Sequence, residues 1–237
     1  MKKAAIILSV IVLTAFLSSC YFPGSIKGNG NVVEETRELD EFSKISVSRG
    51  MNVYISQGTS SKVVVKADEN LLKVIDTYVD DGTLKVTALK GIRNATSNKV
   101  YVTVTDLENI KSSSGSNIFS EDSLKTGNME IKSSSGSNIR LSLESGELII
   151  SASSGSNIFL NGKAKSANIK ASSGSNIKAG DLHAESCDAK VSSGANIWIK
   201  VQNGLTAKSS SGGNIFYSGE PNPLQMTKSS GGNIIKN

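Results

Sequence analysis

The sequence predicts an all-β fold in which a parallel β-solenoid, with about 19–20 residues per coil, follows a shorter set of N-terminal strands. The first indication is the motif Ser113-Ser114-Gly115-Ser116-Asn117-Ile118, which returns in near copies until the chain ends. Its glycines are Gly115, Gly136, Gly155, Gly174, Gly194, Gly212 and Gly231. The steps between them are 21, 19, 19, 20, 18 and 19 residues, a period typical of solenoids. The second indication is the alternation of apolar and polar residues between the glycines, which is typical of strands with one buried face.

The N-terminus has the features of an export signal. Two lysines precede an apolar run over residues 4–17, which is shorter than the roughly 20 apolar residues that span a bilayer. The segment Leu17-Ser18-Ser19-Cys20 resembles the lipobox of bacterial lipoproteins, in which the cysteine is diacylated and becomes the first residue of the mature chain. We therefore expect a signal peptide over residues 1–19 and a membrane anchor through the lipid on Cys20. Ordinary secretion with an incidental cysteine is the alternative.

Charge and cysteine content restrict the class of protein. The chain has 26 Lys and Arg against 21 Asp and Glu, and removal of a signal peptide with two lysines leaves a net charge of about +3 (24 − 21). No run of like charges occurs along the sequence, so nucleic acid is not an expected partner. Once Cys20 is lipidated, Cys187 is the only thiol left. No disulfide can then form within the chain, and stability has to come from packing.

The segment after the anchor changes character near residue 32. Residues 20–31 are rich in Gly, Ser and Asn and are expected to form a lipidated tether with little structure. Residues 32–110 contain several short alternating or β-branched runs, which predict strands. Asp80-Asp81-Gly82 lies between two such runs and predicts a hairpin. Residues 70–75 could add one helical turn.

The repeats of residues 111–237, aligned on their glycines, predict which side chains face the interior. The residue three positions after each glycine is always isoleucine, and the residues five and seven positions before it are mostly apolar, so these positions form inward rows. Asparagine recurs two positions after every glycine. In coils stacked about 4.8 Å apart it would form a ladder of side-chain amides. Lysine fills most positions four before the glycine, which point outward.

Three ordered motifs precede the repeats: residues 28–33 (GNGNVV), 42–58 (FSKISVSRGMNVYISQG) and 67–72 (ADENLL). Together with the Ser-Gly-Ser-Asn-Ile repeats, they resemble the putative auto-transporter adhesin head GIN domain family over essentially the whole mature chain. The resemblance implies a right-handed parallel β-helix on an exported, often lipidated protein of Gram-negative bacteria. It implies adhesion as the role inferred for the family, and it brings no catalytic motif. We therefore expect a lipid-anchored protein of the cell envelope, at the outer membrane, while the residues after Cys20 indicate no leaflet.

The position four residues after each glycine carries the candidate functional residues. In stacked coils this position forms one outward stripe of Phe119, Arg140, Phe159, Lys178, Trp198 and Phe216, ending at Ile235. Aromatic rings flanked by cations suit sugars or peptide strands, so a glycan or protein ligand is the functional interpretation. The stripe could instead be structural, because exposed cation–π pairs stabilise by about 0.5–1 kcal/mol each. It could also be covered by the N-terminal half.

The residue types that perform catalysis are not arranged for it. The serine runs have no general base in reach, because the single histidine, His183, is expected at a solvated corner. Serines stacked in tight bends explain these runs. The adjacent acids of residues 80–81 and 121–122, both expected in turns, lack the spacing of paired catalytic carboxylates. Cys187 falls in an inward row, which favours an inert thiol.

These observations predict a non-catalytic envelope protein with a binding, adhesive or scaffolding role. The repeats also lack the Gly-Gly-x-Gly-x-Asp pattern of calcium-binding solenoids, so neither a metal nor a cofactor is expected. The alternative is a carbohydrate-active β-helix enzyme whose site lies in a groove between the N-terminal strands and the solenoid. Only three residues follow the last Asn-Ile pair, so the final coil is expected either to associate end to end with another chain or to be capped by the tail.

Overall fold

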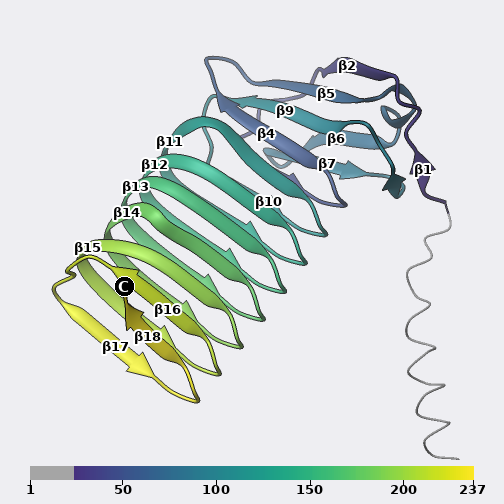
Figure 1. Cartoon of the computed structure of the whole chain (residues 1–237). Coiled ribbons are helices and arrows are strands. Elements are labelled where there is room, and N and C mark those ends of the chain that lie inside the picture. Colours follow the sequence, from purple (N-terminus) through teal and green to yellow (C-terminus); the bar gives the residue numbers. More distant parts are fainter. Residues whose placement is uncertain (1–23) are drawn as a thin grey trace, which may run out of the picture.

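The protein is a β-solenoid, and the computed structural model describes its residues 24–237. The expected signal peptide and Cys20 lie outside the described residues. Figure 1 shows the stacked coils, with the N-terminal strands at one end and the C-terminus at the other. Sixteen strands belong to one sheet, and β1 (Ile26–Lys27) and β8 (Ile92–Arg93) form a separate parallel pair. No helix within the described residues is long and apolar enough to cross a bilayer. The predicted fold class is confirmed.

Five long strands form the middle of the solenoid, and each runs from one bend to the next. They are β11 (Asn117–Ser133), β12 (Asn138–Ala152), β13 (Asn157–Ala171), β14 (Asn176–Val191) and β15 (Asn196–Ser209). Neighbouring coils pair in parallel and place equivalent repeat positions side by side, as with Asn117 and Asn138. The same register reaches Asn233 in the last strand. One repeat therefore makes one coil.

The predicted inward rows form a continuous core. All seven isoleucines of the Asn-Ile pairs are buried, from Ile118 at 0% exposure to Ile234 at 6%. The rows before the glycine are buried as well, except in the last coil, where Leu224 and Met226 are 38% and 49% exposed. These two side chains keep the register of the inward rows but are not buried, because no further coil within residues 24–237 covers them.

The bends between coils are tight two-residue turns. In the third copy Ser154 has φ +52° and Gly155 has φ +69°, and the Ser156 N–H donates to the Ser153 carbonyl at 3.2 Å. Positive φ at both central residues makes this a type I′ turn. The buried Ser156 hydroxyl donates to the Ser133 carbonyl of the preceding coil at 2.8 Å. The serine runs thus serve the bends, as predicted.

The N-terminal half continues the solenoid and then closes it. Its strands are β2 (Val32–Arg37), β3 (Lys44–Val47), β4 (Asn52–Gln57), β5 (Lys62–Asp68), β6 (Ile75–Asp80), β7 (Thr83–Ala88), β9 (Asn98–Val104) and β10 (Asn109–Ser112). β3 and β4 extend the coils in parallel register, with Arg49 and Gly50 at positive φ in their bend. Antiparallel pairing of β2 with β5, and of β6 with β7, caps this end. The β6–β7 hairpin turns at Asp81-Gly82 as predicted, and the expected helical turn is a 3-10 helix at Glu69–Leu71.

Residues 26–31 are more ordered than expected for a tether. β1 pairs with β8, and the Gly30 N–H donates to Oδ2 of the buried Asp68 at 3.0 Å. The expectation of little structure was wrong here, because β1 pairs with β8 and the Gly30 N–H binds a carboxylate 38 positions away. The segment is therefore part of the cap.

The C-terminal end is open. Its strands are β16 (Asn214–Ser218), β17 (Leu224–Lys228) and β18 (Asn233–Lys236). β17 pairs only with β15, and β18 pairs only with β16, among the strands of residues 24–237. Both strands therefore present one unpaired edge.

Candidate functional site

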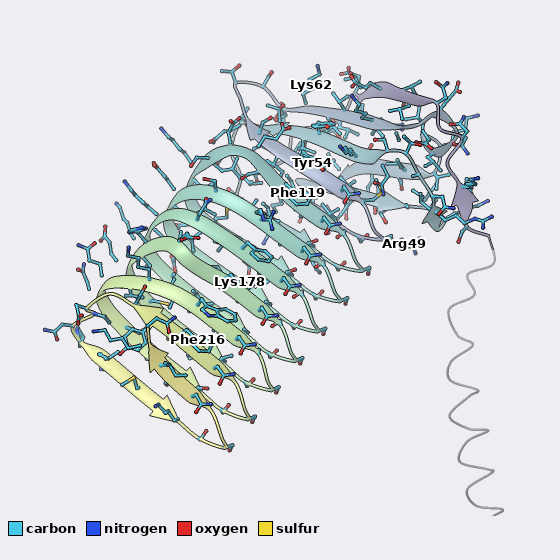
Figure 2. All side chains as sticks on the ribbon, in the orientation of Figure 1. Arg49, Tyr54, Lys62, Phe119, Lys178 and Phe216 are labelled. Atoms are coloured by element: carbon cyan, nitrogen blue, oxygen red, sulfur yellow. The ribbon has the colours of Figure 1, made fainter. Side chains whose placement is uncertain are left out.

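The structure brings the six predicted stripe residues side by side on one face. They lie in direct register on successive coils, in the order Phe119, Arg140, Phe159, Lys178, Trp198, Phe216. Ile235 follows Phe216 at the open end. In Figure 2 the labelled Phe119, Lys178 and Phe216 follow one line down the solenoid. Because the strands pair in parallel register, residues that are about 20 positions apart in the sequence lie in contact.

Ring and cation contacts hold the stripe together. The Lys178 ammonium lies 5.2 Å from the ring centroid of Phe159 and 5.9 Å from that of Trp198. The Arg140 guanidinium lies 5.0 Å from the Phe159 centroid, and the rings of Trp198 and Phe216 stack at 5.1 Å. The aromatic residues are half-buried, whereas Arg140 and Lys178 are exposed. Phe159 therefore has a cation on each side.

The stripe extends two coils further than the sequence reasoning placed it. Tyr54 stacks on Phe119 at 5.2 Å and on Tyr101 at 5.2 Å, and the Lys99 ammonium lies 5.4 Å from the Tyr54 centroid. Tyr54 stands four residues after Gly50, the spacing of every later copy. This spacing could have identified Tyr54 from the sequence, but the serine run that marks the later copies is absent beside Gly50. Because the N-terminal half extends the coils, it does not cover the stripe.

A hollow of about 600 Å³ opens beside the middle of the stripe. We call it the Phe159 hollow, and its polar and aromatic lining residues are Arg140, Phe159, Asn161, Lys178, Asp181 and Trp198. The β13–β14 register shifts here, so that Asn161 faces Asp181 and Gly180 is an extra residue. The exposed side chains of Asn161 and Asp181 make no hydrogen bond to any part of residues 24–237. The alignment of the repeats did not identify either residue. The bulge shifts Asp181 by one position from the repeat register, whereas Asn161 keeps the register and pairs with Ser142.

A second hollow, of about 470 Å³, contains several carboxylates near the junction of the two halves. Its acidic residues are Asp106, Glu108, Glu130 and Glu147. Glu130 accepts a hydrogen bond from Asn109 Nδ2 at 2.7 Å and pairs with Lys132 at 2.5 Å, and Glu108 accepts one from the Ser43 hydroxyl at 3.1 Å. Among residues 24–237, no three His, Cys, Asp or Glu side chains gather closely enough to hold a metal ion.

The remaining residues that drew attention in the sequence lie apart from both hollows. His183 is exposed on β14, and Cys187 is buried. Burial, and secondarily the charge of Asp188, raises the pKa of the Cys187 thiol to about 12. Glu121 and Asp122 are exposed at a bulge in β11, so the expectation that they form a turn was wrong.

The motifs and the repeat agree with comparison to known families. Residues 41–221 match the family described as "Putative auto-transporter adhesin, head GIN domain". The chain belongs to this family. The resemblance seen in the sequence is thereby confirmed. The description of the family as a putative adhesin indicates an adhesin-like protein of the cell surface or envelope.

Solved structures share the head GIN fold. A putative adhesin from Bacteroides fragilis NCTC 9343 is 24% identical with a TM-score of 0.83, over 90% of this chain and 100% of that one. A putative adhesin from Parabacteroides merdae ATCC 43184 is 20% identical with a TM-score of 0.74, over 90% and 99%. A putative lipid binding protein from Parabacteroides distasonis ATCC 8503 is 21% identical with a TM-score of 0.69, over 90% and 99%. No curated protein matches the chain.

Proposed function

We propose that this head GIN protein is a non-catalytic, lipid-anchored envelope adhesin that binds a glycan at the Phe159 hollow. The observation that carries the proposal is the combination of a half-buried ring, two exposed cations and two polar side chains with no hydrogen-bond partner in residues 24–237. Ligand sites characteristically combine aromatic walls with a few placed polar groups.

Each group in the hollow matches a feature of a sugar ring. Arg140 and Lys178 lie over the Phe159 ring from the two neighbouring coils, so the exposed edge of the ring offers the apolar contact for the C–H groups of a pyranose. The Asn161 amide both donates and accepts hydrogen bonds, and the Asp181 carboxylate accepts them from hydroxyl groups. Arg140 and Lys178 add donors at the rim.

A purely structural stripe explains only part of this arrangement. Contacts of Phe159 with the two cations would stabilise the stack of coils whether or not a ligand binds. Asn161 and Asp181 take no part in those contacts. The bulge in β14 places Asp181 opposite Asn161 beside the hollow, and this supports a ligand, because bulges commonly re-aim side chains beside functional sites.

The test is glycan-array screening of the purified protein, followed by titration of the best ligand against two variants. The double replacement Phe159→Ser and Trp198→Ser is expected to abolish binding while the circular dichroism spectrum remains that of the native protein. Phe119→Ser changes the same stripe outside the hollow and serves as the matched control, with binding retained. Unchanged binding by the folded double variant would remove the glycan proposal.

Anchoring through Cys20 can be tested separately from ligand binding. With Cys20→Ala, the protein is expected to leave the membrane fraction and to lose the mass of the acyl chains. Protease treatment of intact cells then reports the leaflet. Full protection of the wild-type protein would count against adhesion to anything outside the cell.

The acidic hollow favours a second candidate function, a carbohydrate-active enzyme. It groups four carboxylates at the junction of the two halves, where the sequence places the alternative site. A reducing-end assay on neutral and acidic polysaccharides tests it, with Glu108→Gln and Glu147→Gln as variants. Hydrolysis by the wild type that both substitutions remove would establish the enzyme and displace the non-catalytic proposal.

A further inference from the structure

We propose a second ligand site, independent of the stripe: a groove along the solenoid axis that binds a linear anionic polysaccharide. The groove lies along the strand ends that precede each bend, whereas the stripe lies along the strand ends that follow it. Its volume is about 700 Å³, and its lining comes from seven successive coils. We call it the lysine groove.

One wall of the lysine groove is a row of lysines that are far apart in the sequence. In register order the row is Lys111, Lys132, Ser151, Lys170, Lys190, Lys208 and Thr227. Neighbouring members of a parallel sheet lie about 4.8 Å apart. Five ammonium groups therefore occupy a line of about 24 Å, although no run of basic residues exists in the sequence.

The other wall is a row of serines at the entrance of each bend. These are Ser134, Ser153, Ser172, Ser192, Ser210 and Ser229. Their hydroxyl groups make no hydrogen bond within residues 24–237, in contrast to the buried serines inside the bends. Most coils thus present one ammonium and one unpaired hydroxyl to the same groove.

The charge of the groove is only partly neutralised. Lys132 pairs with Glu130 at 2.5 Å and Lys190 pairs with Asp188 at 3.1 Å, and both pairs are solvent-exposed, so they contribute little and a stronger anion can displace them. Lys111, Lys170 and Lys208 have no acidic partner among the described residues. Along the axis, the Lys111 ammonium is about 14 Å from that of Lys170, which is about 10 Å from that of Lys208. A polymer with regularly recurring anions can meet all of them at once.

The chemistry of the groove favours a polysaccharide over other polyanions. Single-stranded nucleic acids need aromatic side chains on which bases stack, and the groove lining contains none. Acidic side chains on one face of an extended peptide recur about every 6.6 Å, which does not match the coil spacing. A chain of uronic acids supplies carboxylates for the lysines and hydroxyl groups for the serines.

The test measures binding of the full-length protein, in nonionic detergent, to immobilised polygalacturonate. Binding is expected to weaken as salt rises. The triple variant Lys111→Gln, Lys170→Gln and Lys208→Gln is expected to lose about tenfold or more in affinity, since it removes three exposed charge contacts. The matched control removes the same charge outside the groove, with Lys163→Gln, Lys165→Gln and Lys200→Gln, and is expected to bind like the wild type.

Further probes separate this proposal from its competitors. The stripe variant Phe159→Ser with Trp198→Ser is expected to keep polygalacturonate binding, so that failure of the glycan proposal leaves the lysine groove untouched. Equal losses in the two triple variants, with unchanged thermal unfolding, would reduce the effect to net charge and overturn the site. Equal binding of neutral dextran, or tighter binding of single-stranded or duplex DNA, would overturn the choice of ligand.

Discussion

Each repeat asparagine except the last, Asn233, is bonded to its equivalents on both neighbouring coils. Nδ2 of Asn157 donates to Oδ1 of Asn138 at 3.0 Å, and Nδ2 of Asn176 donates to Oδ1 of Asn157 at 3.0 Å. The ladder runs in one direction from Asn98 in β9 to Asn233 in β18. An interior asparagine is thus a donor and an acceptor, while Asn233 at the end only donates along the ladder.

The loss in free energy of unfolding when an asparagine is replaced should therefore depend on its position in the ladder. We predict that Asn157→Ala lowers the free energy of unfolding by about 1–3 kcal/mol, because it leaves an oxygen and an amide without partners. Asn233→Ala loses one exposed bond and should cost about 0.5 kcal/mol. Urea unfolding of both variants measures the difference. Equal costs would mean that the ladder does not act as a connected row.

Asp68 is a buried carboxylate that ties the N-terminal segment to the cap. It accepts N–H groups from Ser97 at 2.9 Å, Gly30 at 3.0 Å and Thr96 at 3.2 Å. Burial by itself would raise the pKa of this carboxyl, but the backbone hydrogen bonds outweigh it and leave the pKa below the ordinary value of 3.8. The fold therefore stabilises the ionised form of Asp68.

A pH dependence of stability follows from that lowered pKa. Because the folded pKa of Asp68 is depressed, its contribution is present above the unfolded value of 3.8 and is lost as pH falls through the folded pKa. We predict that Asp68→Asn destabilises the protein at pH 7 and that the gap from the wild type narrows at pH 3. Urea unfolding at both pH values checks this, with the exposed Asp122→Asn as control. A gap that is constant with pH would contradict it.

At the scale of elements, the bends need glycine for its backbone conformation and not for lack of space. Gly155 has φ +69°, and a Cβ placed there would meet nothing within 4 Å. We predict that Gly155→Ala costs about 1–2 kcal/mol through the left-handed backbone alone. Gly127→Ala is the control, since Gly127 has the same open surroundings without a positive φ. Thermal unfolding compares them, and similar melting temperatures for the two variants would contradict the account.

The strands and bends of the solenoid were predictable because the same pattern of apolar and turn residues recurs in each repeat. Every Asn-Ile pair fixes one outward and one inward side chain, so an error at one copy is corrected by the others. Tyr54 was missed because its coil keeps the glycine spacing but replaces Ser-Gly with Arg49-Gly50. Asp181 was missed for a different reason: a bulge displaces it by one position from the register on which the alignment depends, and so its place opposite Asn161 could not be predicted.

At the scale of the whole molecule, the two ends differ. Antiparallel strands close the N-terminal end, while β17 and β18 leave an unpaired edge with Met226 at 49% and Ile235 at 44% exposure. The tail forms β18 instead of folding across the coil. An open edge with apolar side chains is a template for pairing with another chain.

We predict that the protein associates through this end at high concentration. Charges introduced by Met226→Lys and Ile235→Lys should shift the population to monomers in sedimentation experiments, because burying them at the interface is unfavourable. Ile149→Lys, at a side chain that is 40% exposed in the middle of the solenoid, should have no effect. A wild-type protein that stays monomeric at every concentration would contradict the prediction.

The lysine groove shows why a basic surface of the folded molecule could not be predicted from the sequence. Its five lysines are separated by 18 to 38 residues, from 190–208 to 132–170, so no window of the sequence contains a basic cluster. The aligned repeats did predict that these lysines point outward. What they did not reveal is that Glu130 and Asp188 neutralise two lysines and leave three without an acidic partner among the described residues. Pairing of that kind depends on side-chain geometry, which periodicity does not encode.

The attachment of residues 26–31 to the cap has a mechanical consequence. If the chain is tethered through its N-terminus and holds a ligand on the solenoid, flow stretches the molecule between the tether and the ligand. Tension then enters at the two-residue β1–β8 pair, next meets the hydrogen bonds of Asn70 with Lys27 and Asn29, and then meets the one from Gly30 to Asp68. These few bonds are loaded before any coil of the solenoid. The force that the protein withstands without partial unfolding would therefore be set at its cap, away from the surface that holds the ligand.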